Sequence, residues 1–233
     1  MDSFKGIRPE AMWMLAENRF HDSKTYYEEH KARIRAEVLE PLRALAADLS
    51  GDVLKIDGQI VTSPTTNNTV SRIRRDNRYS KDKSMYRENV WIAFMRDKKA
   101  WDCLPGFFAD MSLKESVYGM GFYAATPQLM NTLRAMLDED PEPFVKALKK
   151  ARRAGFVLEG DRYARPKKTG LPPLVDELYN RKMWSLEKVT DDPAFFGGPE
   201  LSATLREVFQ ALAPMYRLII AGVERELEER DKE

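Results

Sequence analysis

The spacing of apolar residues changes twice along this 233-residue chain, and this change constrains its fold more than any other feature. Residues 8–50 and 126–228 carry apolar side chains at helical intervals. Residues 52–124 instead carry short runs rich in β-branched and aromatic side chains: VLKI, TVSRIR, NVWIAFM, FFADMSL and VYGMGFYAA. Gly, Pro, Asn and Asp separate these runs. The pattern predicts strands joined by turns between two helical regions.

A helical region before and after one block of strands predicts an α+β fold rather than a parallel βαβ fold. We expect a central, mainly antiparallel sheet, flanked by N-terminal and C-terminal helices, in a single domain over residues 1–233. The run MWSLEKV predicts one further strand late in the chain.

Individual residues predict where several helices begin and end. Pro9 suits the first turn of a helix, and Asp22 or Ser23 suits the cap of the next one. Gly51 is expected to end that second helix, and Pro214 to interrupt or bend the last helix.

The chain is almost neutral, but its cations are concentrated in one segment. The 38 basic and 37 acidic residues give a net charge of +1, so a field of the whole molecule that attracts nucleic acid is not expected. Residues 71–87 carry seven basic and two acidic side chains, a net charge of +5 that leaves −4 for the remainder. The positive field is therefore local.

The few cysteines and histidines limit the chemistry of the chain. Cys103 is the single cysteine, so it has no internal disulfide partner, which favours a reducing, cytoplasmic setting. One Cys with two His is a poor basis for a zinc site, and no acid cluster marks a magnesium site, so we expect no metal and no cofactor. Structural roles are expected for Cys103, His21 and His30. No window approaches the roughly 20 apolar residues of a membrane span, so no membrane partner is expected.

The basic segment contains RIRRDNRYSKDKSMY, residues 72–86. Its notable side chains, at fixed intervals, are Arg72, Arg75, Asp76, Arg78, Tyr79, Lys83 and Tyr86. The spacing resembles R-x-x-R-D-x-R-F-x-x-x-K-x-x-Y, the hallmark of the domain-of-unknown-function family 2461, conserved hypothetical proteins of bacteria. Tyr79 stands in place of Phe, which keeps the ring and adds a hydroxyl. YYEEHK, LPGFFADMSLKESVYGMGFY and LRAML also resemble this family, so the likeness covers nearly the whole chain. The resemblance implies no established activity.

The chemistry of the segment favours anion binding. Arginine is a permanently charged planar fork suited to bidentate contacts with phosphate or carboxylate. We predict that the anion-binding residues are Arg72, Arg75, Arg78 and Lys83. Asp76 would hold an arginine in place or, together with Tyr86, would transfer protons as a catalytic residue.

Other residues are candidates for a pocket beside these cations: Tyr79, Tyr118, Tyr123 and Arg134. The glycines of YGMGFY lack the context of a dinucleotide-binding loop, and they are better suited to a close approach of strands or of a ligand.

The spacing fits two local geometries. In a helix, Arg72, Arg75, Asp76, Tyr79, Lys83 and Tyr86 would share one face. In a strand, Arg72, Arg74, Asp76 and Arg78 would share one face. The β-branched content of TVSRIR favours a strand that leads into a loop, with Ser80 as the cap of a short turn over 81–86.

Three interpretations of the cluster stay open. It is a solvated charged face, or a structural network in which Arg75 or Arg78 pairs with Asp76 and with acids such as Glu88 or Asp110, or a site for an anionic ligand.

Three candidate functions, from different classes, follow from these observations. The first is an enzyme acting on a phosphorylated or carboxylated small molecule, and it takes a small anionic ligand as its partner. The second is a binding module for nucleic acid or another polyanion, which the negative remainder of the chain disfavours. The third is an interaction protein with a structural Arg/Asp network. A cluster in a pocket would favour a small ligand, and a ridge continuous with Lys167 and Lys168 would favour a polymer.

Overall fold

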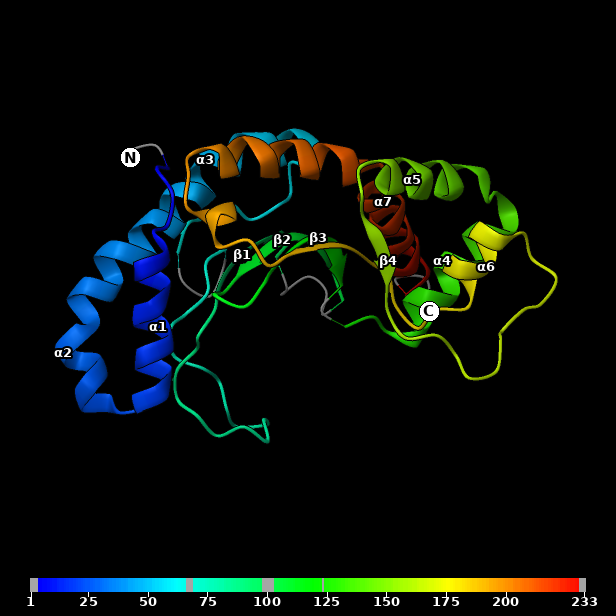
Figure 1. Cartoon of the computed structure of the whole chain (residues 1–233). Coiled ribbons are helices and arrows are strands. Elements are labelled where there is room, and N and C mark those ends of the chain that lie inside the picture. Colours follow the sequence, from blue (N-terminus) through cyan, green and yellow to red (C-terminus); the bar gives the residue numbers. More distant parts are fainter. Residues whose placement is uncertain (1–3, 66–68, 98–102, 123, 231–233) are drawn as a thin grey trace. The chain divides into compact units, whose positions relative to one another are not determined.

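The computed structural model describes residues 4–65, 69–97, 103–122 and 124–230 (Figure 1). Its chain contacts define two compact units, each built from three segments. Unit 1 comprises Met1–Phe94, Phe108–Tyr118 and Val189–Glu207, and unit 2 comprises Met95–Phe107, Gly119–Lys188 and Val208–Glu233. That residues 1–233 form a single domain stays a prediction.

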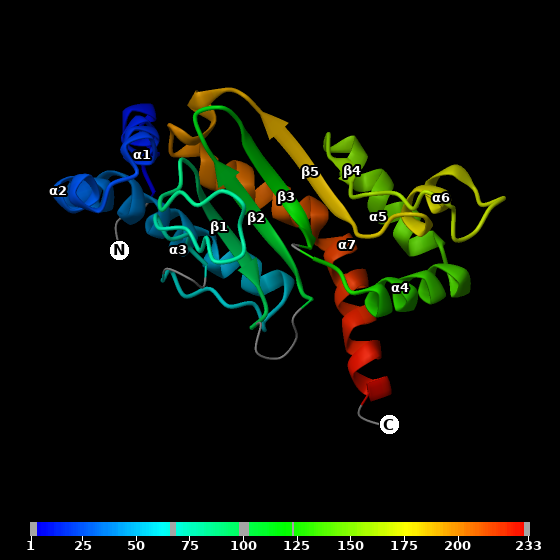
Figure 2. The same cartoon turned by 90° about the horizontal axis from the view of Figure 1, so that it is seen from below.

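The α+β class is confirmed, with an antiparallel sheet flanked by helices of the N- and C-terminal regions. The strands occur in the order β1-β2-β3-β5-β4 (Figure 2). Their bounds are Val90–Met95 for β1, Pro105–Met111 for β2, Ser116–Phe122 for β3, Ser185–Thr190 for β5 and Val157–Glu159 for β4. Buried and partly exposed side chains alternate along β1, so one of its faces is the more deeply buried.

Two features of these strands bear on the sequence predictions. The strand expected over MWSLEKV is β5, and its partner β4 was not predicted because three residues carry too short a pattern. Gly119 in β3 lies against β5 so closely that a Cβ atom would collide with the carbonyl oxygen of Leu186. Glycine at this position therefore permits the close approach of two strands. This confirms one of the two expectations for YGMGFY, the approach of strands rather than of a ligand.

Unit 1 begins with a series of helices. These are α1 (Pro9–His21), α2 (Lys24–Ile34), the π-helical turn η1 (Arg35–Leu39) and α3 (Glu40–Ile56). Pro9 opens α1 as expected, and the Ser23 hydroxyl caps α2 by accepting from the Tyr26 amide. The wider turn η1 ends at Leu39, and Pro41 is the second residue of α3, in the first turn where its missing N–H is tolerated.

Two expectations for the end of α3 are wrong. The run VLKI is helical rather than a strand, and Gly51 lies inside α3 rather than after it. Val53 and Ile56 continue the buried stripe of Leu45 and Leu49, at helical spacing. Burying two large aliphatic side chains contributes about 1.5–3 kcal/mol each, which outweighs the cost of about 1 kcal/mol for glycine in a helix.

Unit 2 contains α4 (Pro127–Glu139), α5 (Glu142–Arg153) and α6 (Pro173–Tyr179). The long helix α7 (Glu200–Arg230) has residues 200–207 in unit 1 and its remainder in unit 2, and the 3₁₀ turn η2 (Pro193–Phe196) precedes it in unit 1. Of the two outcomes expected at Pro214, interruption is wrong, because this residue lies inside one continuous helix, and bending stays a prediction. Buried neighbours on both sides, Ala213 and Met215, hold the helix together across the missing hydrogen bond.

Aromatic side chains form much of the core of unit 2. The ring of Phe107 lies 5.1 Å from that of Phe209 and 4.8 Å from that of Tyr216, and Phe144 meets Trp184 edge to face. In the part of the chain that the structure describes, every helix is too short or too polar for a membrane span.

Candidate functional site

Residues 71–87, called the basic loop below, form an irregular hairpin that extends from β1 in unit 1. Arg74 pairs with Tyr86 in an antiparallel bridge, and Val70 pairs with Ile92 in another. Between the bridges lie three residues on one side and five on the other, so the second side bulges. The predicted strand over TVSRIR is therefore reduced to single bridges, and no helix forms over 72–86.

The start of the basic loop still alternates as a strand does. Ile73 is buried, whereas Arg72 and Arg74 on either side are exposed. Their side chains therefore extend into solvent.

Arg75 and Lys83 close the tip of the basic loop from within. Arg75 forms an ion pair with Asp82 and donates from Nη1 to Ser84 Oγ at 2.8 Å. Lys83 Nζ donates to the carbonyl oxygen of Asn77 at 3.1 Å, and Asn77 Nδ2 donates back to the Lys83 carbonyl oxygen at 2.7 Å. These two predicted anion-binding cations are therefore engaged in holding the loop.

Ser80 has a different role from the one expected. Residues 81–86 form no helical turn for it to cap, and its hydroxyl instead accepts from Arg75 Nη2 at 3.5 Å.

Asp76 and Arg78 form a bidentate pair at the loop surface. Arg78 Nε donates to Asp76 Oδ1 at 2.9 Å, and Nη2 donates to Oδ2 at 2.7 Å. The hydrogen bonds from Arg78 lower the pKa of Asp76 to about 2. The pKa of Asp82 is likewise held well below its usual range, first by hydrogen bonds from Ser84 and then by Arg75. Asp76 thus holds an arginine, as one interpretation expected.

Arg19 of helix α1 and Asp22, which directly follows this helix, anchor the base of the basic loop. Asp22, in a left-handed conformation with φ 44°, accepts from the amides of Met85 at 2.7 Å and Tyr86 at 3.2 Å. Arg19 Nη2 contacts Asp82 Oδ2 at 2.7 Å. The Tyr86 ring is buried and stacks on Tyr27 with centroids 4.9 Å apart, and this burial raises the pKa of the Tyr86 hydroxyl.

Three cations of the basic loop stand apart from these networks. Arg72, Arg74 and Lys81 are exposed, and none of them has an ion pair or side-chain hydrogen bond to another described residue. Only Arg72 was among the predicted anion-binding residues. The alternation around buried Ile73 could have identified Arg74, whereas no sequence signal marked Lys81.

Two exposed aromatic side chains belong to the basic loop and to helix α1, which contacts it. The Tyr79 side chain is 95% exposed, and the Arg78 guanidinium lies 5.8 Å from its ring centroid. Phe20, next to the anchoring Arg19 on α1, is 86% exposed.

The other predicted pocket residues have different surroundings. Tyr118 is buried in unit 1, where its ring stacks on Phe195 at 4.6 Å and burial raises its pKa. Tyr123 lies outside the described residues. Arg134 is buried in unit 2 and donates from Nε and Nη2 to the carbonyl oxygens of Tyr179 and Arg181, both at 2.8 Å. The Arg134 side chain thus supports the backbone of its own unit.

The acids named in the structural interpretation have other partners. Both carboxylate oxygens of Asp110 accept from Asn89 Nδ2 at 2.8 Å, and burial raises the pKa of Asp110. Glu88 pairs with Lys114.

Histidine and cysteine side chains occupy packing positions. The rings of His21 and His30 both stack on the ring of Tyr26, with centroids 4.1 and 4.0 Å away. Cys103 is buried, and its Sγ lies 2.9 Å from the carbonyl oxygen of Ala124. Among the residues described, no three His, Cys, Asp or Glu side chains are grouped as metal ligands.

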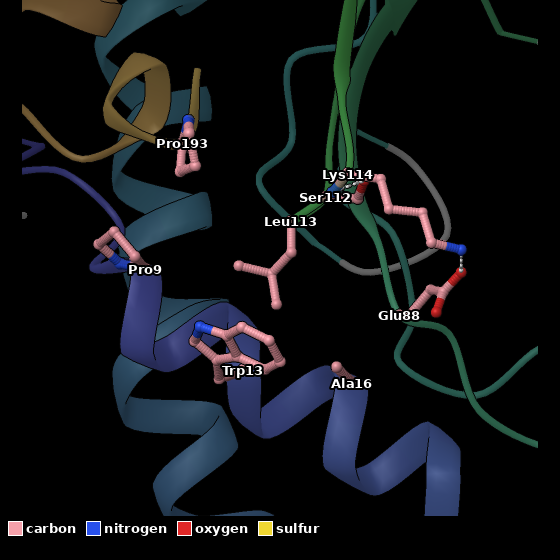
Figure 3. A pocket seen from close by; sticks show the side chains of 8 residues that line it. All are labelled: Pro9, Trp13, Ala16, Glu88, Ser112, Leu113, Lys114 and Pro193. Carbon is pink, nitrogen blue, oxygen red and sulfur yellow. Dashed lines mark hydrogen bonds and ion pairs between the residues drawn. The ribbon is translucent and has the colours of Figure 1, made fainter. Parts of the chain in front are cut away.

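A cavity of about 350 Å³ lies in unit 1 and was not predicted (Figure 3). Its walls come from α1, the β2–β3 turn, the start of η2 and the segment before β1. The lining residues are Pro9, Trp13, Ala16, Glu88, Ser112, Leu113, Lys114 and Pro193. The apolar members are scattered over the first 16 residues and two distant turns, so no local pattern brings them together.

Comparison with known proteins places the chain in a family. A family model described as conserved hypothetical protein (DUF2461) matches residues 10–218. The chain therefore belongs to this family, whose domain has no assigned function. Neither the curated proteins nor the solved structures contain a match.

Proposed function

We propose that this protein binds single-stranded nucleic acid through the basic loop. The observation that carries the proposal is the exposure of Arg72, Arg74 and Lys81, which form no ion pair or side-chain hydrogen bond with another described residue. Phosphates of an extended backbone are suitable partners for such cations.

The arrangement supports binding rather than proton transfer. With its pKa near 2, Asp76 is a weak base at neutral pH, and Arg78 occupies both of its oxygens. Tyr86 is buried against Tyr27, and its raised pKa keeps the hydroxyl protonated. The small-molecule enzyme is therefore the less supported of the predicted functions.

Exposed aromatic rings favour nucleic acid over an acidic protein. Unpaired bases stack on aromatic side chains, at about 1–3 kcal/mol per base. Tyr79 lies within the basic loop, and Phe20 follows the arginine that anchors it. A loop held by internal bonds also loses little conformational entropy on binding. A cytoplasmic location, which the single cysteine favours, is part of the proposal.

The test is fluorescence anisotropy with a labelled single strand of about 12 nucleotides, a length within the site sizes of such proteins. The variant Arg72→Ala/Arg74→Ala/Lys81→Ala is expected to bind about tenfold or more weakly. The matched control Lys5→Ala/Arg35→Ala/Lys55→Ala removes the same charge elsewhere in unit 1 and is expected to bind as the wild type does.

Two results would contradict the proposal. One is equal affinity of the wild type and the basic-loop variant. The other is equal binding of polyglutamate and the oligonucleotide, which would indicate an acidic protein partner. Thermal unfolding of each variant shows whether a loss of binding reflects a loss of fold.

A further inference from the structure

We propose that the cavity of unit 1, called the Trp13 pocket below, binds a nucleobase. The choice of a nucleobase among flat heteroaromatic ligands rests on the proposed function, whereas the pocket and its chemistry do not.

The apolar walls of the pocket suit a flat ring. The Trp13 side chain is 61% exposed although it belongs to a regular helix, and Leu113 points toward it from the β2–β3 turn (Figure 3). Pro9 and Pro193 complete this side of the pocket. A volume of about 350 Å³ lies in the range of small-molecule sites and accommodates one heteroaromatic ring system beside the indole. Stacked aromatic rings contribute about 0.5–1.5 kcal/mol beyond the burial of their area.

Hydrogen bonds hold the walls in place. Ser112 Oγ accepts from the amides of Lys114 and Glu115, both at 3.2 Å, which shapes the turn that carries Leu113. The Ile7 amide donates to the Phe196 carbonyl oxygen at 2.8 Å and joins the start of α1 to η2. The pocket is therefore preorganised rather than formed by a mobile segment.

One edge of the pocket offers a hydrogen-bond donor beside an acceptor. Lys114 Nζ and Glu88 Oε1 lie 3.4 Å apart at the end of the pocket opposite Trp13, and their side chains are 81% and 48% exposed (Figure 3). A long, exposed ion pair contributes little stability, so a ligand can replace it at low cost. A base with an exocyclic amine next to a ring nitrogen or carbonyl oxygen matches this pair, because the amine donates to Glu88 and the ring atom accepts from Lys114.

The helix that forms one wall also leads toward the basic loop. Phe20 follows Trp13 by two helical turns, so the two exposed rings lie on one face of α1. Arg19, which directly precedes Phe20, contacts Asp82 of the basic loop at 2.7 Å. A single strand with a base in the Trp13 pocket can thus follow this helix face toward the cations of the basic loop.

Free nucleosides test the pocket without phosphate groups. The measurement is quenching of tryptophan fluorescence by cytidine, adenosine, guanosine and uridine. The contribution of Trp13 is the fraction of the quenching signal that is lost in Trp13→Leu. We expect saturation with a Kd of about 1 mM for the amine-bearing bases and at least tenfold weaker binding of uridine. Glu88→Gln is expected to reduce this difference between the bases. Leu54→Ala, which removes another exposed apolar side chain of unit 1 away from the pocket, is the control and is expected to bind nucleosides as the wild type does.

The failures of the two proposals are distinguishable. The basic-loop variant is expected to bind nucleosides as the wild type does, because no phosphate is involved. Absence of saturation by any nucleoside would overturn the nucleobase pocket. An unchanged nucleoside affinity of Trp13→Leu, measured by saturation-transfer NMR, would also overturn it. Binding of 1-anilinonaphthalene-8-sulfonate in the pocket, when no nucleoside binds there, would do the same.

Discussion

Asp22 connects two distant parts of unit 1 through one carboxylate. It accepts from the amides of Met85 and Tyr86, and its left-handed backbone suits Asp or Asn. Asp22→Ala leaves both amides without this acceptor, so we expect a loss of about 2 kcal/mol in the free energy of unfolding, measured with urea. Asp22→Asn keeps an acceptor oxygen and the backbone preference and is expected to lose less than half as much. Equal losses in both variants would contradict this account.

The pair of Asp76 and Arg78 predicts a pH dependence. The folded-state pKa of Asp76, about 2, lies below its ordinary value of 3.8, so the folded state favours the charged form. The resulting stabilisation is complete above the unfolded pKa and is lost as the pH falls from about 4 through about 2. Asp76→Asn is expected to show a smaller decrease in unfolding free energy over this window than the wild type. Asp161→Asn, which removes another exposed carboxylate, is the control, and identical decreases in Asp76→Asn and the wild type would contradict the assignment.

At the residue scale, the sequence indicated which side chains of the basic loop are notable better than it indicated which residues they pair with. The pair Asp76–Arg78 follows from two residues with one between them. The partners of Arg75 and Lys83 depend on how the basic loop folds back, so adjacent charges gave no indication of them. For the same reason, Arg74 and Lys81 were not recognised as the cations that remain unengaged.

At the element scale, α3 offers a gain in stability. Gly51 lies inside this helix, and an added Cβ would meet no atom within 4 Å. Gly51→Ala is therefore expected to raise the free energy of unfolding by about 0.5–1 kcal/mol, because alanine restricts the unfolded chain and favours the helix. Unfolding in urea measures this gain, and a loss of stability would mean that the helix ends before this residue.

The close approach of β3 and β5 predicts the opposite result for a second glycine. A Cβ at Gly119 would collide with the backbone carbonyl of Leu186, which has no flexible atoms that could yield. Gly119→Ala is expected to lower the free energy of unfolding by about 1–3 kcal/mol. Gly58→Ala is the control, because its Cβ would meet nothing within 4 Å. Equal stability of the two variants would contradict the observed strand spacing.

Errors in element prediction arose where burial outweighed local propensity. Gly51 and Pro214 are typical of helix ends, yet buried side chains on both sides keep each one inside a helix. The helix starts at Pro9 and Ser23 depend on short-range bonds and were predicted correctly. Three-residue β4 forms only because β5 supplies its partners, which a local pattern does not contain.

At the scale of the whole molecule, the charges are more segregated than the net value of +1 suggests. The basic loop carries +5, and residues 162–168 carry four further basic residues without an acid. In unit 2, however, Arg162 pairs with Asp176 and Lys168 with Asp138. Half of the cations of that second segment are thus paired. Nucleic-acid binding is assigned to the basic loop because its three unpaired cations share that loop with the exposed ring of Tyr79.

The succession of a helical region, a block of strands and a second helical region followed from the sequence because it depends on apolar periodicity. The division into two units did not, because residues of β1, β2, β3, β5 and α7 contribute to both, and contacts between distant segments define each unit. The Trp13 pocket was missed for a related reason, since its walls come from segments that are far apart in the sequence.

The most direct test of the account is the salt dependence of oligonucleotide binding. For single strands, the logarithm of the binding constant falls with the logarithm of salt concentration, with a slope of about −0.7 for each phosphate contacted. Three unengaged cations predict a slope of about −2 for the wild type and a slope near zero for Arg72→Ala/Arg74→Ala/Lys81→Ala. The same slope in both proteins would show that the basic loop does not bind the phosphate backbone.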